Sequence, residues 1–301
     1  MSMHPGRRFG RGRRPILIGL TTALLTAGTV TAPAAQAAKR GLDGQIAYTV
    51  GPPGAYQVVR KNADGSGVVT PLTPASRSIA EPSWSPDGTM IAALEVGVGV
   101  VMFPSKGGPI VTLDTGTQDF TPSWSPDGDY IAFVKAGDIV ILPVDLSTGP
   151  ITIVAGGSSP DWSSDGRQIA YTNTTGTLFT VDALPTAGTP VPRTVPGVVW
   201  NPASLKEISW SPDRTRIAYA KATKDGLQYV HLGNLAPTDI NGPPGASEPS
   251  WSPDGRRIAF GRIAGGQLGV FTTPVGDGSF TTVDPTGFLP DWQACRYHCR
   301  R

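Results

Sequence analysis

The sequence has few of the residues from which metal centres and disulfide-rich scaffolds are built. Among 301 residues there are 2 Cys and 3 His, and charged side chains make up only 16%. Two Cys exclude a disulfide-dense scaffold and an array of zinc ribbons, and three His leave little material for a metalloenzyme, so we expect no metal and no other cofactor. Long helices are also excluded, because 38 Gly and 30 Pro interrupt the chain every few residues.

The sequence after residue 37 also has no excess of basic residues that could form a basic surface. The net charge is +2, but five of the arginines stand in residues 1–37, which contain no acidic residue. The rest of the chain carries 20 basic and 23 acidic residues, a net charge of −3. No basic stripe remains that could neutralise phosphates, so we expect no nucleic-acid partner.

Residues 1–37 have the pattern of a secretory signal peptide. A basic stretch, residues 1–14, precedes an apolar run, residues 16–30, and Ala35-Gln36-Ala37 matches an A-x-A cleavage site. The run is shorter than the roughly 20 residues that cross a bilayer. We therefore expect cleavage near Ala37-Ala38, a secreted or cell-envelope protein, and no stable membrane span. An uncleaved anchor is the alternative, and two arginine pairs leave open whether export follows the general or the twin-arginine route.

An internal repeat indicates the fold. Segments such as EPSWSPDGTMIAAL and TPSWSPDGDYIAFV recur along the chain, and their tryptophans are Trp84, Trp124, Trp162, Trp210, Trp251 and, in a half repeat, Trp292. The successive spacings are 40, 38, 48, 41 and 41 residues. A period near 40 with a Trp, a turn and a following strand is typical of an all-β propeller with one four-stranded blade per repeat.

The two ends of the repeat region are complementary. Residues 43–48 are the second half of a repeat with no Trp half before it, and residues 289–292 are a Trp half with nothing after it. Six blades are therefore predicted, with the closing blade shared between the N- and C-terminal strands, which leaves no open edge. We expect a linker at 38–43, the propeller at 44–293, a tail at 294–301, and a monomer. In the second repeat the predicted strands are 122–125, 130–135, 138–144 and 151–154.

The repeated P-x-W-S-P-D-G-x-x-I-A-[YFA] resembles the repeat of TolB-type propellers, which are relatives of WD-type repeats. The resemblance covers residues 44–293 and implies a binding module, because in that family the channel and one face bind peptide segments of partner proteins. TolB also carries an N-terminal α/β domain, for which this chain has no room. That difference puts the family's envelope-translocation role in doubt.

Residues that recur in every repeat are expected to be architectural. One Asp per repeat occupies the same turn position, and we interpret these residues as turn formers and not as a metal or acid–base set; they are Asp87, Asp127, Asp165, Asp213 and Asp254. The six repeat tryptophans are expected to fill the gaps between blades. No G-x-S-x-G elbow is present, and of the two His residues of the mature chain, His231 is expected to be an ordinary strand residue.

The candidate binding residues are those that stand apart from the repeat. Glu81, Glu207 and Glu248 lie three positions before their tryptophans, and with Asp291 they predict an acidic crescent at one channel mouth, beside Trp200. Such a crescent would favour a cationic peptide segment or a divalent cation. The alternatives are that each Glu bonds the backbone of the neighbouring blade, and that Trp200 covers a gap between blades.

The tail contains the two cysteines, Cys295 and Cys299, separated by three residues. In an exported protein they predict a local disulfide, with a metal site as the alternative. The sequence as a whole therefore predicts a secreted propeller that binds a protein or peptide and is not an enzyme. Two other functions remain open: an enzyme acting on an extracellular polymer, with carboxylates at the channel mouth, and a carbohydrate-binding propeller that uses Trp200.

Overall fold

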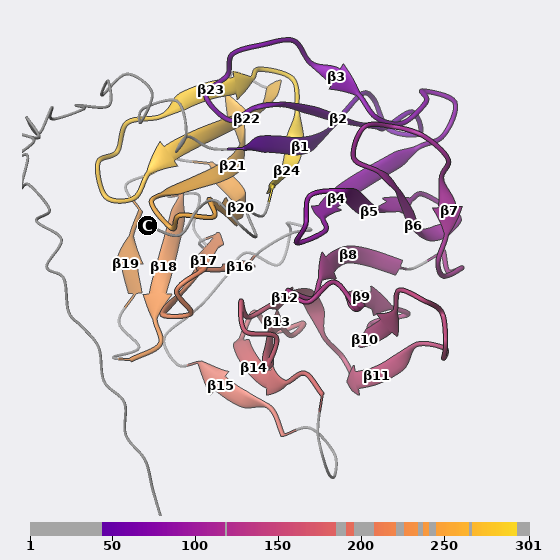
Figure 1. Ribbon diagram of the computed structural model, residues 1–301. Coiled ribbons are helices and arrows are strands. Elements are labelled where there is room, and N and C mark those ends of the chain that lie inside the picture. Colours follow the sequence, from indigo (N-terminus) through magenta and orange to yellow (C-terminus); the bar gives the residue numbers. More distant parts are fainter. Residues whose placement is uncertain are drawn as a thin grey trace, which may run out of the picture. The chain divides into compact units, whose positions relative to one another are not determined.

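The computed structural model describes residues 44–117, 119–184, 191–195, 208–220, 226–233, 237–240, 245–264 and 267–293. All of them belong to one compact unit. Every regular element in these ranges is a β-strand, and the strands form six four-stranded sheets, which are the blades of a six-bladed propeller (Figure 1). The predicted fold class is confirmed.

Each of the first three blades is a simple antiparallel meander of four consecutive strands. Blade one contains β4 (Ile79–Trp84), β5 (Met90–Glu95), β6 (Gly99–Pro104) and β7 (Val111–Thr112). Blade two contains β8 (Asp119–Trp124), β9 (Tyr130–Lys135), β10 (Asp138–Pro143) and β11 (Ile151–Val154). Blade three contains β12 (Ser158–Trp162), β13 (Gln168–Thr172), β14 (Leu178–Asp182) and β15 (Arg193–Val195).

Blades four and five repeat this plan, and blade six closes the ring. Blade four contains β16 (Ile208–Trp210), β17 (Arg216–Ala220), β18 (Leu227–His231) and β19 (Pro237–Asp239). Blade five contains β20 (Ala246–Trp251), β21 (Arg257–Ala264), β22 (Gln267–Pro274) and β23 (Thr281–Asp284). Blade six contains β24 (Phe288–Trp292), β1 (Gln45–Val50), β2 (Gln57–Asn62) and β3 (Thr70–Pro71).

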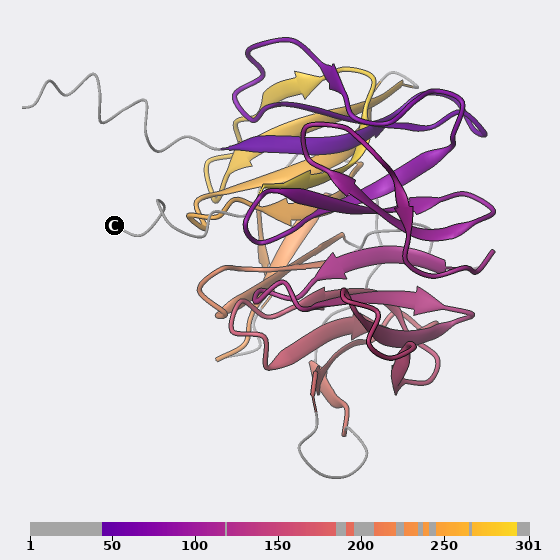
Figure 2. The ribbon, with the colours of Figure 1, turned by 45° about the vertical axis from the view of Figure 1, so that its right-hand side comes forward.

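Closure joins the two ends of the described chain. Strand β24 pairs antiparallel with β1, with Ile46 opposite Trp292 and Ala47 opposite Asp291. The backbone N–H of Gln293 also donates to the carbonyl oxygen of Gln45 at 2.9 Å. Figures 1 and 2 both show β24, in yellow, beside β1, in indigo. The predicted shared blade is confirmed, because β24 is its innermost strand and β1, β2 and β3 are the other three.

The core lies between the blades. Six clusters of buried apolar residues occur, one at each interface between neighbouring blades, and each combines residues from two sheets. At the interface of blades four and five, for example, Ala218 and Leu227 pack with Trp251 and Phe260. Of the six repeat tryptophans, five are buried and Trp124 is half-buried against the same clusters. Their predicted role as gap fillers is confirmed.

The innermost strands begin earlier than predicted. Strand β8 starts at Asp119 and not at residue 122, while β9 and β11 have the predicted bounds. The difference arises from a bulge: the register of β8 against β9 shifts between Phe120 and Ser123. The strand therefore continues through Thr121-Pro122 although the ladder is interrupted there, since a bulge leaves residues of one strand unpaired without ending the strand.

Candidate functional site

The same bulge recurs in the innermost strands of blades one, three, five and six, where it accompanies one residue in an unusual backbone conformation. The residue three positions before the Trp has a positive φ in the five described blades of this kind, at Glu81 (55°), Thr121 (51°), Ser159 (51°), Glu248 (57°) and Leu289 (53°). This left-handed region is sparsely populated by residues with a Cβ atom. The predicted crescent residues Glu81 and Glu248 therefore occupy a position that the propeller repeats for its own geometry.

The carboxylates at these bulges join neighbouring blades. Glu81 in blade one accepts a hydrogen bond from the backbone N–H of Thr121 in blade two at 2.5 Å. Glu248 in blade five accepts one from the N–H of Leu289 in blade six at 2.7 Å. Glu81 itself donates its backbone N–H to Thr49 Oγ1 of blade six at 3.2 Å. Both described glutamates thus have the inter-blade backbone role that the sequence analysis kept as the alternative.

The two glutamates differ in burial. Glu81 is only 3% exposed, whereas Glu248 is partly exposed. Glu248 lies against Gly261 of the adjacent strand β21, where an added Cβ atom would collide with the carboxylate. The absence of a side chain at Gly261 makes room for Glu248, so this glycine and this glutamate belong to one packing arrangement.

A second ring of polar side chains stands directly before the tryptophans and also links blades. Asp291 accepts a hydrogen bond from the N–H of Trp84 at 2.9 Å, and Asp161 accepts one from the N–H of Trp210 at 2.6 Å. In the neighbouring blades a serine does the same, since Ser250 Oγ accepts from the N–H of Trp292 at 2.9 Å. Asp291 therefore has an architectural contact as well. Asp161 was not predicted, although its place before Trp162 matches that of Asp291 before Trp292.

The innermost strands carry charge of one sign. Across β4, β8, β12, β16, β20 and β24 there is no Lys or Arg, and the acidic residues are Glu81, Asp119, Asp161, Glu248 and Asp291. The strands that surround the propeller axis are therefore acidic.

The opposite ends of the innermost strands are the Ser-x-Asp turns, and their aspartates shape the turn. In all five, the Asp accepts a hydrogen bond from the Ser hydroxyl two residues earlier, at 2.5–2.8 Å. The Asp also accepts one from the backbone N–H two residues later, at 3.0–3.2 Å. The predicted turn-forming role is confirmed, because one carboxylate oxygen bridges both sides of the turn.

These contacts set the acidity of the turn aspartates. Burial alone would raise the pKa of Asp213, but hydrogen bonds from Ser211 and Thr215, together with the charge of Arg216, lower that pKa to about 2. The pKa values of Asp87 and Asp165 are lowered as well, since burial is outweighed by hydrogen bonds from the turn. These carboxylates are ionised at neutral pH and unsuited to act as general acids.

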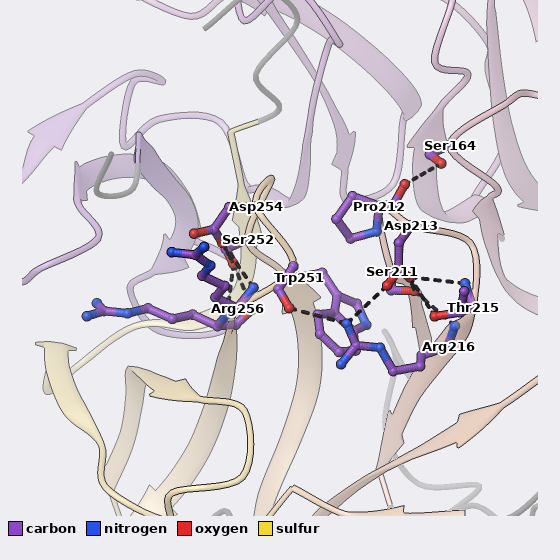
Figure 3. A network of polar contacts seen from close by, with 12 residues as sticks. Ser164, Ser211, Pro212, Asp213, Thr215, Arg216, Trp251, Ser252, Asp254 and Arg256 are labelled. Carbon is purple, nitrogen blue, oxygen red and sulfur yellow. Dashed lines mark hydrogen bonds and ion pairs between the residues drawn. The ribbon is translucent and has the colours of Figure 1, made fainter. Parts of the chain in front are cut away.

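Blades three, four and five also carry arginines in these turns, of which Figure 3 shows Arg216 and Arg256. Arg216 stacks over the Trp251 ring, with Cζ 4.4 Å from the ring centroid, and donates to the carbonyl oxygen of Gly255 at 3.3 Å. Arg214 bonds Asp165 of the preceding blade at 2.6 Å. The sequence analysis did not single out these arginines, because each lies inside a repeat unit that was interpreted as architecture.

Several predicted residues lie outside the described residues. These are Trp200, Glu207, Cys295 and Cys299, together with the signal peptide and linker. His231 lies in β18, as expected of a strand residue. Among the described residues there is no group of three or more His, Cys, Asp or Glu side chains that could hold a metal ion. The described ranges also contain no helix with the length and apolar character needed to cross a membrane.

Comparison with known proteins identifies the fold. No protein-family model matches the sequence, and no curated protein matches it. Among solved structures, TolB from Acinetobacter baumannii aligns with a TM-score of 0.66 and 17% identity, over 84% of this chain and 67% of that one. A chain of a nidogen/laminin complex aligns with a TM-score of 0.65 and 9% identity, over 83% of this chain and 99% of that one.

A third similar structure is an enzyme. A puromycin-hydrolysing peptidase from Mycobacterium tuberculosis aligns with a TM-score of 0.55 and 16% identity, over 81% of this chain but only 45% of that one. At these identities the likeness concerns the fold alone. The chain has a TolB-type six-bladed propeller fold.

Proposed function

We propose that this protein is a secreted or cell-envelope propeller that binds a segment of a partner protein. Two of the similar folds come from structures of TolB and of a nidogen/laminin complex, and the latter is by its description a protein–protein assembly. Each described Ser-x-Asp turn carboxylate and both described glutamates of the crescent have structural hydrogen bonds. These contacts favour a binding role over a catalytic one.

The observation that carries the proposal further is the charge of the innermost strands, which within the described residues hold five acidic residues and no basic one. Like charges arranged around a narrow axis add their potentials and focus them along it. A partner segment bearing Lys or Arg, or a free amino terminus, would be drawn to the axis mouth beside Glu81 and Glu248.

The test is a titration with a labelled lysine-rich peptide, comparing the wild type with the triple variant Glu81→Gln, Glu207→Gln, Glu248→Gln. Glutamine keeps an oxygen that can accept the inter-blade hydrogen bonds made by Glu81 and Glu248, while three charges are removed. We expect the affinity to fall about tenfold, which corresponds to about 1.4 kcal/mol of binding free energy. We also expect the salt dependence to flatten, since the Debye length is about 8 Å at physiological ionic strength.

One control and one substitute variant make the result interpretable. Asp129→Asn removes one exposed acidic charge from the turn that follows β8, at the opposite end of that strand from Thr121, and should leave the affinity unchanged. If the triple variant does not fold, Asp161→Asn with Asp291→Asn removes two charges from the ring before the tryptophans. Unchanged affinity and salt dependence in a folded variant of either kind would contradict the proposal.

Export has its own test. We propose that Cys295 and Cys299 form an intramolecular disulfide in the mature protein, since disulfides persist in oxidising compartments. Mass spectrometry of freshly secreted protein, alkylated without reduction, should show a first residue near Ala38 and no alkylated cysteine. Two alkylated thiols, or a retained segment 1–37, would contradict the assignment.

A further inference from the structure

The turn of blade four departs from the other described turns at one backbone position. The residue after the turn Asp is a glycine with positive φ in four blades, at Gly88 (71°), Gly128 (85°), Gly166 (73°) and Gly255 (69°). In blade four this residue is Arg214, with φ 62°. A residue with a Cβ atom is strained in this region, whereas glycine is not.

The local contacts of Arg214 do not account for its presence there. Its guanidinium pairs with Asp165 at 2.6 Å, but the Arg214 side chain is 53% exposed. An exposed ion pair of this kind contributes less than the left-handed conformation costs. Because four blades form the same turn with glycine, the side chain of Arg214 is a candidate for a role outside the fold.

Arg214 has an arginine on each side, in the neighbouring turns. Arg167 of blade three has a side chain that is 83% exposed and reaches Asp165 only at 3.9 Å. Arg256 of blade five is exposed, and its guanidinium has no hydrogen bond or ion pair within the described part of the chain. We call Arg167, Arg214 and Arg256 the arginine row.

The three turns of the arginine row touch one another. Ser164 Oγ of blade three donates to the carbonyl oxygen of Pro212 in blade four at 2.8 Å (Figure 3). Arg216 of blade four reaches the carbonyl oxygen of Gly255 in blade five. In blades one and two the position of Arg167 and Arg256 is held by Thr89 and Asp129 instead. The row is therefore a continuous feature of one side of the turn ring.

We propose that the arginine row is a second docking surface, which binds an acidic segment of a partner protein. Arginine presents a planar fork of N–H donors that fits a carboxylate bidentately, and it is enriched where binding energy is concentrated. Three such forks on three adjacent blades suit several Asp or Glu side chains along one extended segment. The surface is independent of the ligand that binds at the axis.

The donors of these turns favour carboxylates over a phosphate group. Phosphate sites commonly use a cluster of free backbone N–H groups. Here the N–H groups of Arg167, Thr215 and Arg256 already donate to the turn aspartates, at 3.0–3.2 Å. The guanidinium groups of the row are therefore the donors that would recognise an anion, and that of Arg214 would exchange its bond with Asp165 for one with the ligand.

The test is a titration of the full chain with a labelled glutamate-rich peptide at low ionic strength. The variants are Arg167→Gln with Arg256→Gln, Arg214→Gly alone, and all three together, and Lys106→Gln in the exposed β6–β7 turn is the control. We expect the triple variant to bind about tenfold more weakly and with a flatter salt dependence, and the control to match the wild type. Arg214→Gly should weaken binding without lowering the melting temperature.

Three results would overturn the proposal. The first is a failure of the expected binding pattern: the wild type does not bind the acidic peptide, or the folded triple variant binds it as tightly as the wild type does. The second is a Lys106→Gln protein that loses as much affinity as the triple variant, which would make the effect one of total charge. The third is binding of phosphatidylserine vesicles that depends on the row while binding of the peptide does not, which would assign the surface to a membrane.

Discussion

The two ends of the innermost strands differ in what their charged side chains do. At the start of these strands, Glu81 is buried, and the carboxylates of Glu81 and Glu248 each accept a hydrogen bond from a backbone N–H group of the next blade. At the end, in the turns of blades three to five, Arg167, Arg214 and Arg256 extend toward solvent. The first end therefore uses its carboxylates to join blades. The second end presents exposed arginines, of which Arg214 also bonds Asp165 of the preceding blade.

Within one repeat, residues that maintain the ring can therefore be distinguished from residues that are candidates for binding. A position that has the same contact in blade after blade, such as the turn Asp, is explained by the geometry of the ring. Arg214 is not explained in this way, because the other blades place glycine there and form the same turn. In a repeat protein the informative residues are those that break the pattern at some energetic cost.

The largest expected effect comes from removing an innermost strand. Truncation after Thr286 deletes β24, with buried Leu289 and Trp292, and leaves β1 paired with β2 alone. Loss of a buried Trp alone costs about 3–5 kcal/mol, so we expect a protein that is unfolded or melts far below the full-length protein in a thermal scan. Truncation after Gln293, which keeps every described strand, is the control. Equal melting temperatures for the two truncations would disprove the closure by β24.

Next in size is the loss of one inter-blade carboxylate. Glu81→Ala leaves the buried N–H of Thr121 without its acceptor, which should cost about 1–3 kcal/mol of unfolding free energy. Glu81→Gln should cost less, because the amide oxygen can still accept the bond. Urea denaturation of both variants measures the difference. If Glu81→Ala is as stable as the wild type, the glutamate does not join the blades.

A smaller effect is expected from the turn aspartates at acid pH. The pKa of Asp213 in the folded protein is about 2, below its ordinary value of 3.8, so its ionised form stabilises the fold above pH 3.8. This contribution should be lost as the pH falls from 3.8 through 2. Asp213→Asn should therefore flatten the decline of stability over that interval, measured by urea denaturation at each pH. An identical decline in both proteins would exclude Asp213 as a contributor.

The smallest effect is expected at Arg214. Replacement by glycine relieves the left-handed strain but adds freedom to the unfolded chain, and the two changes oppose each other with about 1 kcal/mol each. We expect the unfolding free energy to stay within about 1 kcal/mol of the wild type in urea denaturation. A loss as large as that predicted for Glu81→Ala would show that Arg214 is needed for the fold, and would remove the reason for assigning it a binding role.

The architecture could be predicted from the sequence because each repeat contains short local patterns that indicate its strands and turns. The Trp spacing indicates six blades, the half repeats indicate the shared blade, and the Ser-x-Asp turn is visible within four residues. The bulge at Thr121-Pro122 was missed, since a strand that continues through a broken ladder has no local signature. The start of β8 was therefore placed too late.

The contacts between blades were less predictable. Asp161 receives the N–H of Trp210 in the next blade, and only the assembled ring brings these residues together. The strain at Arg214 could have been noticed, because the sequence reads SPDR where other repeats read SPDG or SSDG. The exposure of Arg214, and its position between Arg167 and Arg256, follow from how neighbouring blades pack in the folded ring. No local sequence pattern indicates them.

The claim that the two ends of the innermost strands have separate roles can be tested with one set of titrations. The lysine-rich and the glutamate-rich peptide are each titrated into the wild type, the triple glutamate variant and the triple arginine variant. We predict that the glutamate variant loses affinity only for the lysine-rich peptide and the arginine variant only for the glutamate-rich peptide, by about tenfold in each case. Equal losses for both peptides in either variant, or no loss in both, would contradict the account.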